Sequence, residues 1–156
     1  MQKNKKEISH NFQERIQKYC AIEERCEFDI KNKLTQWGAK ENSINDIIEK
    51  LIKNKFLNEE RFAKIFCEVK LRTRKWGRVK IIYELKRRYI SERNIQKGLT
   101  SINNTDYIQI LKELLQKKSQ SIKEVDHLKK KKKIVNFLLQ RGFESNLIWD
   151  YIDTYN

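Results

Sequence analysis

The arginines of this chain are concentrated in one short stretch. Six of the ten arginines among the 156 residues lie between positions 72 and 93. A guanidinium group binds phosphate or carboxylate through a planar, two-pronged contact, and it also stacks on flat groups. Because like charges repel one another, such a cluster indicates an anionic partner. We therefore expect one exposed basic face, made of Arg72, Arg74, Lys75, Trp76, Arg78, Lys80, Arg87 and Arg88.

Two features near this chemistry are ambiguous in the sequence. Trp76 is either a core residue at a helix end or a planar surface within the binding face. A run of lysines is either a solvated helix face in a lysine-rich chain or a second contact for the same partner. This secondary basic patch consists of Lys129, Lys130, Lys131, Lys132 and Lys133.

Groups suited to catalysis or metal binding are sparse. The two histidines lie far apart, and the three cysteines (Cys20, Cys26 and Cys67) are not clustered. The glycine-rich phosphate motifs and the common serine and zinc hydrolase motifs do not occur in the sequence. Acid pairs such as Glu59-Glu60 stand at expected helix starts, where they favour the helix dipole. We expect no enzymatic activity, no metal and no cofactor.

The elements that carry the basic residues are expected to be helices. The chain has no proline and four glycines, too few turn residues for a β-rich domain of this size. Apolar residues recur at helical spacing throughout, which predicts an all-α fold of seven to nine short helices. Residues typical of helix starts stand at Ser43, Asn58, Ser91 and Ser121.

Five apolar positions recur three times along the chain. They are Ile30, Leu34, Ala39, Ile44 and Ile48, then Ile81, Leu85, Ile90, Ile95 and Leu99, then Ile134, Leu138, Phe143, Ile148 and Ile152. Each set predicts a helix, a tight turn and a second helix, with a third helix following the first two sets. The pattern predicts an elongated tandem array of three-helix repeats.

We expect this array to form one continuous domain. Its parts would be an N-terminal helix at 1–22 and repeats at 23–75, 76–120 and 121–156, the last one truncated. Gly38 and Gly142 fall at the first and third turns, whereas the second turn has Tyr89. Tyr89 must therefore adopt a left-handed conformation, at a cost of about 1 kcal/mol, or alter the turn.

The sequence also bears on the location of the protein. The net charge is +14, and no apolar stretch approaches the roughly 20 residues that span a bilayer. The first ten residues lack the apolar core of a secretory signal. We expect a cytoplasmic monomer with unlinked thiols and no membrane contact.

Several segments in a fixed order resemble the RecX regulatory proteins. They are Glu24-Arg-Cys-Glu-Phe-Asp-Ile30, Leu34-Thr-Gln-Trp-Gly38, Phe56-Leu-Asn-Glu-Glu-Arg-Phe-Ala63 and Trp76-Gly-Arg-Val-Lys-Ile81 followed by Glu84-Leu85. The resemblance covers roughly residues 15–153 and implies tandem three-helix repeats. The sequence differs from the family pattern at Arg88-Tyr89-Ile90, where RecX proteins usually have Lys-Gly-Ile.

The resemblance implies a regulatory role. RecX proteins bind RecA recombinase filaments on single-stranded DNA and restrain ATP hydrolysis, strand exchange and filament growth. They act in DNA repair, recombination and the SOS response, and they are not enzymes. The alternative is an autonomous helical DNA-binding protein that binds naked DNA through residues 91–101, although that segment offers only two basic groups. A small nuclease would need a metal cluster that the sequence does not offer.

Overall fold

The computed structural model describes the backbone of residues 2–155 and the side chains of residues 10–154. In these residues the chain forms helices and no strands, which confirms the predicted all-α class. The helices are α1 (Gln2–Ile22), α2 (Glu27–Gln36), α3 (Glu41–Lys53), α4 (Glu59–Arg74), α5 (Arg78–Arg87), α6 (Glu92–Thr100), α7 (Asn104–Ser121), α8 (His127–Gln140), α9 (Ser145–Tyr151) and the 3₁₀ helix η1 (Ile152–Tyr155).

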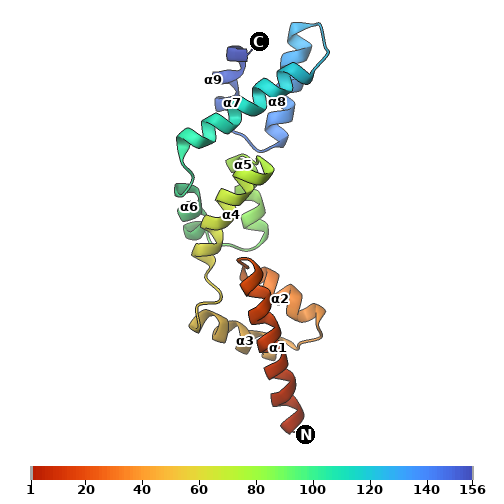
Figure 1. The fold of residues 1–156 in the computed structure, drawn as a ribbon, viewed down its shortest axis with the longest axis vertical. Coiled ribbons are helices and arrows are strands. Elements are labelled where there is room, and N and C mark those ends of the chain that lie inside the picture. Colours follow the sequence, from red (N-terminus) through yellow and green to blue (C-terminus); the bar gives the residue numbers. More distant parts are fainter. Residues whose placement is uncertain (1, 156) are drawn as a thin grey trace.

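The helices follow one another along a long axis. Figure 1 shows α1–α3 at one end, α4–α6 in the middle and α7–α9 at the other end, with the two termini far apart. We refer to these groups as the first, second and third units. The arrangement confirms the expected elongated tandem array. None of the described helices combines the length and the apolar character needed to cross a membrane.

The three predicted turns share one pattern of hydrogen bonds. The carbonyl groups of Leu34, Leu85 and Leu138 accept from the backbone N–H groups of Ala39, Ile90 and Phe143, at 3.0, 3.2 and 3.2 Å. All three leucine side chains are fully buried. This Schellman-type arrangement needs a left-handed residue just past the helix end. Gly38 and Gly142 supply it with φ of 89°, and Tyr89 supplies it with φ of 56°. The predicted repeat is therefore visible in the backbone itself.

The apolar side chains form two separate cores. One lies among α1, α2 and α3 and includes Ile16, Leu34 and Leu51. The other runs without interruption from α4 to Ile152, also takes in Cys26, and includes Leu85 and Leu138. The second and third units are therefore joined by a common core, and the first unit has a core of its own.

Two of the four predicted helix starts are confirmed. The side chains of Asn58 and Ser91 accept from the backbone N–H groups at the third positions of α4 and α6. The predictions at Ser43 and Ser121 are wrong, because α3 already begins at Glu41 and Ser121 is the last residue of α7. The Ser121 hydroxyl instead donates to the carbonyl of Lys118. It therefore satisfies a backbone acceptor in the last turn of α7 and does not cap the start of α8.

Candidate partner-binding surface

A group of basic side chains surrounds the turn between α4 and α5. Arg72 and Arg74 are exposed in the last turn of α4. Lys75 ends that helix in the left-handed conformation, with φ of 55°. We call Arg72, Arg74, Lys75, Trp76 and Lys80 the basic turn. Since its two arginines project into solvent, it can contact phosphate or carboxylate groups without first breaking ion pairs.

Trp76 holds part of this surface in place. Its half-buried ring packs against Phe66 of α4, with 6.4 Å between the ring centroids. The ammonium groups of Lys70 and Lys80 lie 5.3 and 4.9 Å from its ring centroid. Such cation–π contacts fix two positive charges beside one flat side chain. The half-buried Trp76 ring thus packs on α4 and also lies beside two charged groups, and its place in a binding face stays a prediction.

Arg78 does not belong to a free basic face. Its guanidinium lies 3.8 Å from the centroid of the Tyr107 ring and pairs with Glu144 at 3.6 Å. The Tyr107 hydroxyl accepts from the Arg78 backbone N–H at 3.0 Å and donates to the Glu144 carboxylate at 3.0 Å. Burial raises the pKa of this hydroxyl well above its ordinary value, so it stays protonated as a donor. Arg78 therefore ties α5 to the third unit.

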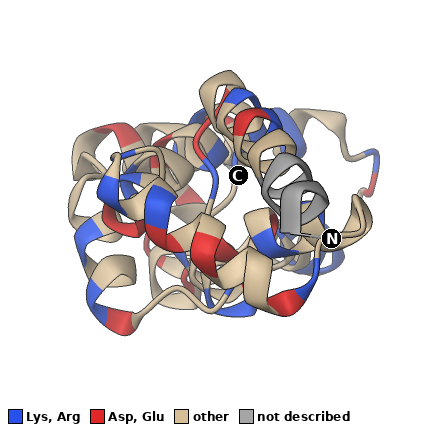
Figure 2. Cartoon of the chain, turned by 90° about the horizontal axis from the view of Figure 1, so that it is seen from below, with Lys and Arg blue, Asp and Glu red and all other residues tan. Residues whose placement is uncertain are grey.

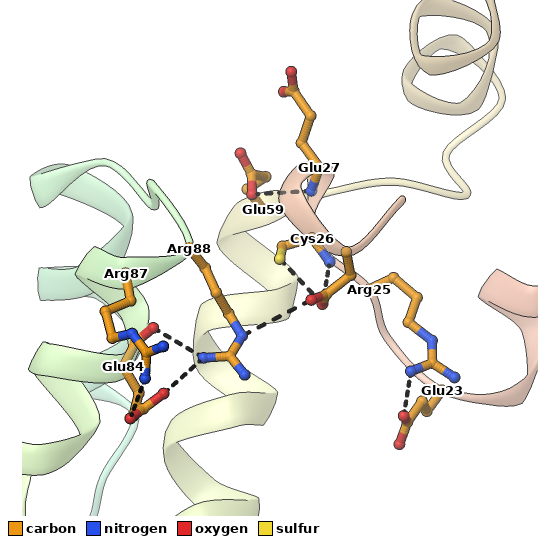
Figure 3. Close-up of polar contacts among 9 residues, drawn as sticks. Glu23, Arg25, Cys26, Glu27, Glu59, Glu84, Arg87 and Arg88 are labelled. Carbon is orange, nitrogen blue, oxygen red and sulfur yellow. Dashed lines mark hydrogen bonds and ion pairs between the residues drawn. The ribbon is translucent and has the colours of Figure 1, made fainter. Parts of the chain in front are cut away.

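Arg87 and Arg88 lie at the other end of α5. This ten-residue helix is about 15 Å long, so these arginines are well separated from the basic turn. Arg88 pairs with Glu84 at 3.0 Å and with Asp29 of α2 at 3.9 Å. Figure 3 shows Arg88 reaching from α5 toward the start of α2, with Arg87 beside Glu84. Arg78, Arg87 and Arg88 are each paired with an acid, so they are not free charges in this structure. That these residues contact a partner stays a prediction.

The backbone fixes the basic turn against the third unit. The Gly77 N–H donates to the carbonyl of Arg141 at 2.8 Å, and the Val79 N–H donates to the carbonyl of Gly142 at 2.9 Å. The Arg141 guanidinium donates to the carbonyl of Arg74 at 2.8 Å. Two further basic residues of this region, Arg141 and Lys70, were not among the residues predicted from the sequence. For Arg141 a signal existed, since it precedes Gly142 as Arg88 precedes Tyr89.

The secondary basic patch begins α8 and is partly neutralised. Lys131 pairs with Asp153 at 2.6 Å and lies over the Trp149 ring, and Lys133 pairs with Glu124 at 3.5 Å. Lys129 and Lys132 are exposed, and Lys130 is half-buried. Viewed along the molecule, basic and acidic segments alternate around the array (Figure 2). Among the described residues, no three His, Cys, Asp or Glu side chains form a group that could hold a metal ion.

Comparison with known proteins identifies the family. A family model described as the second three-helix domain of RecX matches residues 58–99, and one described as the third three-helix domain matches residues 105–152. Together these models match more than half of the chain. The chain belongs to the RecX family.

Relatives of this RecX-family chain are named as regulatory proteins. It is 36% identical over 123 residues to "Regulatory protein RecX" of Clostridium acetobutylicum and 34% identical over 121 residues to that of Clostridium perfringens strain SM101. Each match covers 76% of this chain and 56% of the relative, so the chain spans little more than half of these relatives' length.

Solved RecX structures have the same fold. One RecX crystal structure matches with a TM-score of 0.84 at 21% identity, covering 93% of this chain and 73% of the other. RecX from Lactobacillus salivarius matches with a TM-score of 0.81 at 20% identity, covering 94% and 96%.

The family models also suggest where units begin. They group α4 with α5 and α6, and α7 with α8 and α9, so that the last unit contains three helices. Our division at residues 23, 76 and 121 starts each repeat one helix later. An array of successive helices can be divided at either place, and that division stays a prediction.

Proposed function

We propose that this RecX-family chain restrains a RecA-type recombinase in recombination and the DNA-damage response. It binds the recombinase filament on single-stranded DNA as a cytoplasmic monomer, without a cofactor and without enzymatic activity of its own. Binding slows ATP hydrolysis, strand exchange and filament growth. The support is the membership in a family whose relatives are named regulatory proteins, together with a basic surface suited to an anionic filament.

The basic turn is the observation that carries this proposal. Arg72 and Arg74 are exposed, and Trp76 holds Lys70 and Lys80 beside them. Charge-assisted contacts to phosphate or carboxylate contribute about 1.5–3 kcal/mol each. A few such contacts are sufficient for this protein to bind a filament that carries both phosphate and carboxylate groups. Arg87 and the lysines of α8 act as separate, secondary contacts.

The packing of α6 argues against groove reading by that helix. In an autonomous DNA-binding protein, α6 would enter a groove and present base-reading side chains. Lys97 of α6 instead pairs with Glu60 of α4 at 3.2 Å. Gly98 lies so close to α4 that an added Cβ would be 2.8 Å from the carbonyl oxygen of Ala63. Helix α6 is thus a packing element, with Arg93 as its exposed cation.

The test is the single-stranded-DNA-dependent ATPase rate of a purified recombinase, titrated with this protein. A variant with Arg72, Arg74 and Lys75 changed to Ala should need about tenfold or more protein for half-inhibition, because it lacks three charged contacts. The matched control changes Lys18, Lys50 and Lys53 to Ala. These three exposed lysines of the first unit carry the same total charge.

The outcomes separate the alternatives. Inhibition weakened only in the basic-turn variant supports the proposal, provided that both variants keep wild-type helicity. Equal inhibition by both variants would remove the basic turn from the mechanism. A mobility shift of naked DNA, measured with and without the recombinase, identifies an autonomous DNA binder if the shift is equally strong without it.

A further inference from the structure

The first unit meets the rest of the molecule through a narrow, largely polar junction. The cores on the two sides are separate, and among the described residues of the first unit only Cys26 belongs to the second core and only Phe28 packs against it. Phe28 contacts Tyr89, with 5.8 Å between the ring centroids. Little apolar area is therefore shared across this junction, and the hydrophobic effect holds it only weakly.

Two ion pairs supply much of the remaining contact. Arg88, just past α5, pairs with Asp29 of α2 at 3.9 Å, and Arg61 of α4 pairs with Glu24 just before α2. Arg61 also donates to the carbonyl groups of Lys55 and Phe56, in the segment that links α3 to α4. Arg61 thus joins three parts: the first unit, the linker and the second unit.

These ion pairs are partly shielded from water yet incompletely satisfied. The side chains of Arg88 and Asp29 are 27% and 26% exposed. Glu24 Oε2 is a buried atom without a hydrogen-bond partner in the described part of the chain, whereas Arg61 Nε faces Glu24 Oε1 within the ion pair. The closed position is therefore held by a small net free energy, because desolvation offsets much of the Coulomb attraction, and the loss of one pair is enough to shift the balance.

Hollows lie on both sides of the contact. One, of about 290 Å³, is lined by Tyr19 and Glu23 of the first unit and by Ile65 and Val69 of α4. The other, also about 290 Å³, is lined by Phe28 and Lys31 on one side and by Tyr89 on the other. Arg88 lines both hollows. Few packed side chains therefore surround Arg88 at the junction, and the hollows on its two sides leave space for the first unit to move.

The junction between the second and third units is built differently. It shares one continuous core and has backbone hydrogen bonds from Gly77 and Val79 to the turn after α8. Screening by salt weakens pairs of partly exposed charges but leaves buried apolar packing intact. The two junctions should therefore respond differently to ionic strength.

We propose that α1–α3 form a hinged module that turns as one body about the link between Leu57 and Asn58. The pairs Arg88–Asp29 and Arg61–Glu24 hold it in the closed position, and screening or competition for Arg88 releases it. On one side of this link, the Phe56 and Leu57 N–H groups donate to the Leu51 carbonyl and Leu57 is buried in the first core, so these residues move with α3. On the other side, the Asn58 side chain caps α4. An anionic partner that takes Arg88 from Asp29 opens the hinge, so binding at this end of α5 and movement are coupled. The hinge itself does not depend on which partner the basic turn binds.

Single-molecule energy transfer between two dyes tests this hinge in the full chain. One pair of labels, at Asp46→Cys and Gln96→Cys, spans the first junction. The control pair, at Gln96→Cys and Asp150→Cys, spans the second. All three positions are exposed, and Cys20→Ser removes the half-buried native thiol. Raising NaCl from about 0.1 M to about 1 M shortens the screening length from about 10 Å to about 3 Å.

The hinge predicts that a second population appears at high salt for the 46–96 pair and not for the 96–150 pair. Asp29→Asn keeps an oxygen that can accept from the Cys26 N–H but removes the charge facing Arg88. This variant should raise the open population about threefold at low salt. Glu49→Gln, an exposed charge change on α3, should leave it unchanged.

Other outcomes overturn the proposal. These are a 46–96 distribution that is the same at both salt concentrations and in Asp29→Asn, or equal changes in both label pairs, which would indicate general loosening. If Asp29→Asn loses helicity, the wild-type salt series decides alone, and Arg88→Gln breaks the same pair from the other side.

Discussion

Tyr89 has, with φ of 56°, the left-handed conformation that glycine adopts at the other two turns. Its side chain is 82% exposed, so little packing offsets the backbone cost. The turn forms because the Ile90 N–H bonds to the Leu85 carbonyl and Ile90 is buried beyond it. At the residue scale, one hydrogen bond and one buried side chain therefore outweigh the preference of a non-glycine residue for negative φ.

Gly142 and Gly38 provide a matched pair for a first prediction. Both have φ of 89°, but a Cβ at Gly142 would lie 2.3 Å from Lys80 Cβ, whereas nothing lies within 4 Å at Gly38. Gly38→Ala should cost about 1 kcal/mol from backbone strain. Gly142→Ala should cost about 1–3 kcal/mol more, because the second and third units must separate. Urea unfolding measures both, and equal costs would contradict the close contact.

The cysteines allow a second prediction, on pH. Burial raises the pKa of the Cys26 and Cys67 thiols to about 12, and raises that of half-buried Cys20 less. At pH 8 only about one in 10,000 of the two buried thiols is ionised, so they should resist alkylation. Cys20 should react first. The rate at Cys26 should rise about tenfold per pH unit up to pH 10.

Mass spectrometry after timed alkylation without reductant measures these rates. Freshly purified protein should contain three free thiols. Similar rates at all three cysteines, or a missing thiol, would show that the thiols are not buried and unlinked as described.

At the scale of the elements, the three helix pairs are built alike, but the first belongs to one core and the other two share a second core. Leu34 and Leu85 are fully buried at equivalent turns, one in the core of α1–α3 and the other in the core of α4–α9. Neighbouring units in a repeat array stabilise one another only across interfaces that they share. Equivalent substitutions should therefore spread their effects over different helices.

This difference gives the third prediction. Leu34→Ala and Leu85→Ala should each cost about 2–5 kcal/mol in the unit that contains them. Hydrogen exchange followed by segment should show faster opening of α1–α3 alone for Leu34→Ala, and of α4–α9 together for Leu85→Ala. Faster exchange over the whole chain in both variants would mean that the first junction couples the units as strongly as the second.

At the scale of the whole molecule, the positive charge is distributed unequally between free and paired groups. Arg78 and Arg88 hold units together, whereas Arg72 and Arg74 are exposed. Changing Arg78 or Arg88 therefore tests stability and hinge position along with binding. A binding variant that leaves folding intact must be confined to the exposed basic turn.

The fourth prediction concerns the salt dependence of filament binding. If Arg72, Arg74 and Lys75 contact phosphates of single-stranded DNA, each contributes about 0.7 to the slope of log affinity against log salt. The triple Ala variant should then have a slope lower by about 2. Fluorescence anisotropy on labelled filaments at four salt concentrations measures it. An unchanged slope with lower affinity would assign these contacts to recombinase carboxylates instead.

The repeat, the turns and the helical class were determined by the sequence alone, because they depend on local relations. A leucine, a left-handed residue and a buried apolar residue within a few positions suffice to form each turn. Which arginines are free was decided only by the tertiary structure. Glu144 pairs with Arg78, and Asp29 adds to the local Glu84 partner of Arg88, both from positions distant in sequence, and electrostatic pairing depends on distance in space. The separation into two cores likewise appears only when the helices are packed, since apolar periodicity marks a buried face without naming the helix that covers it.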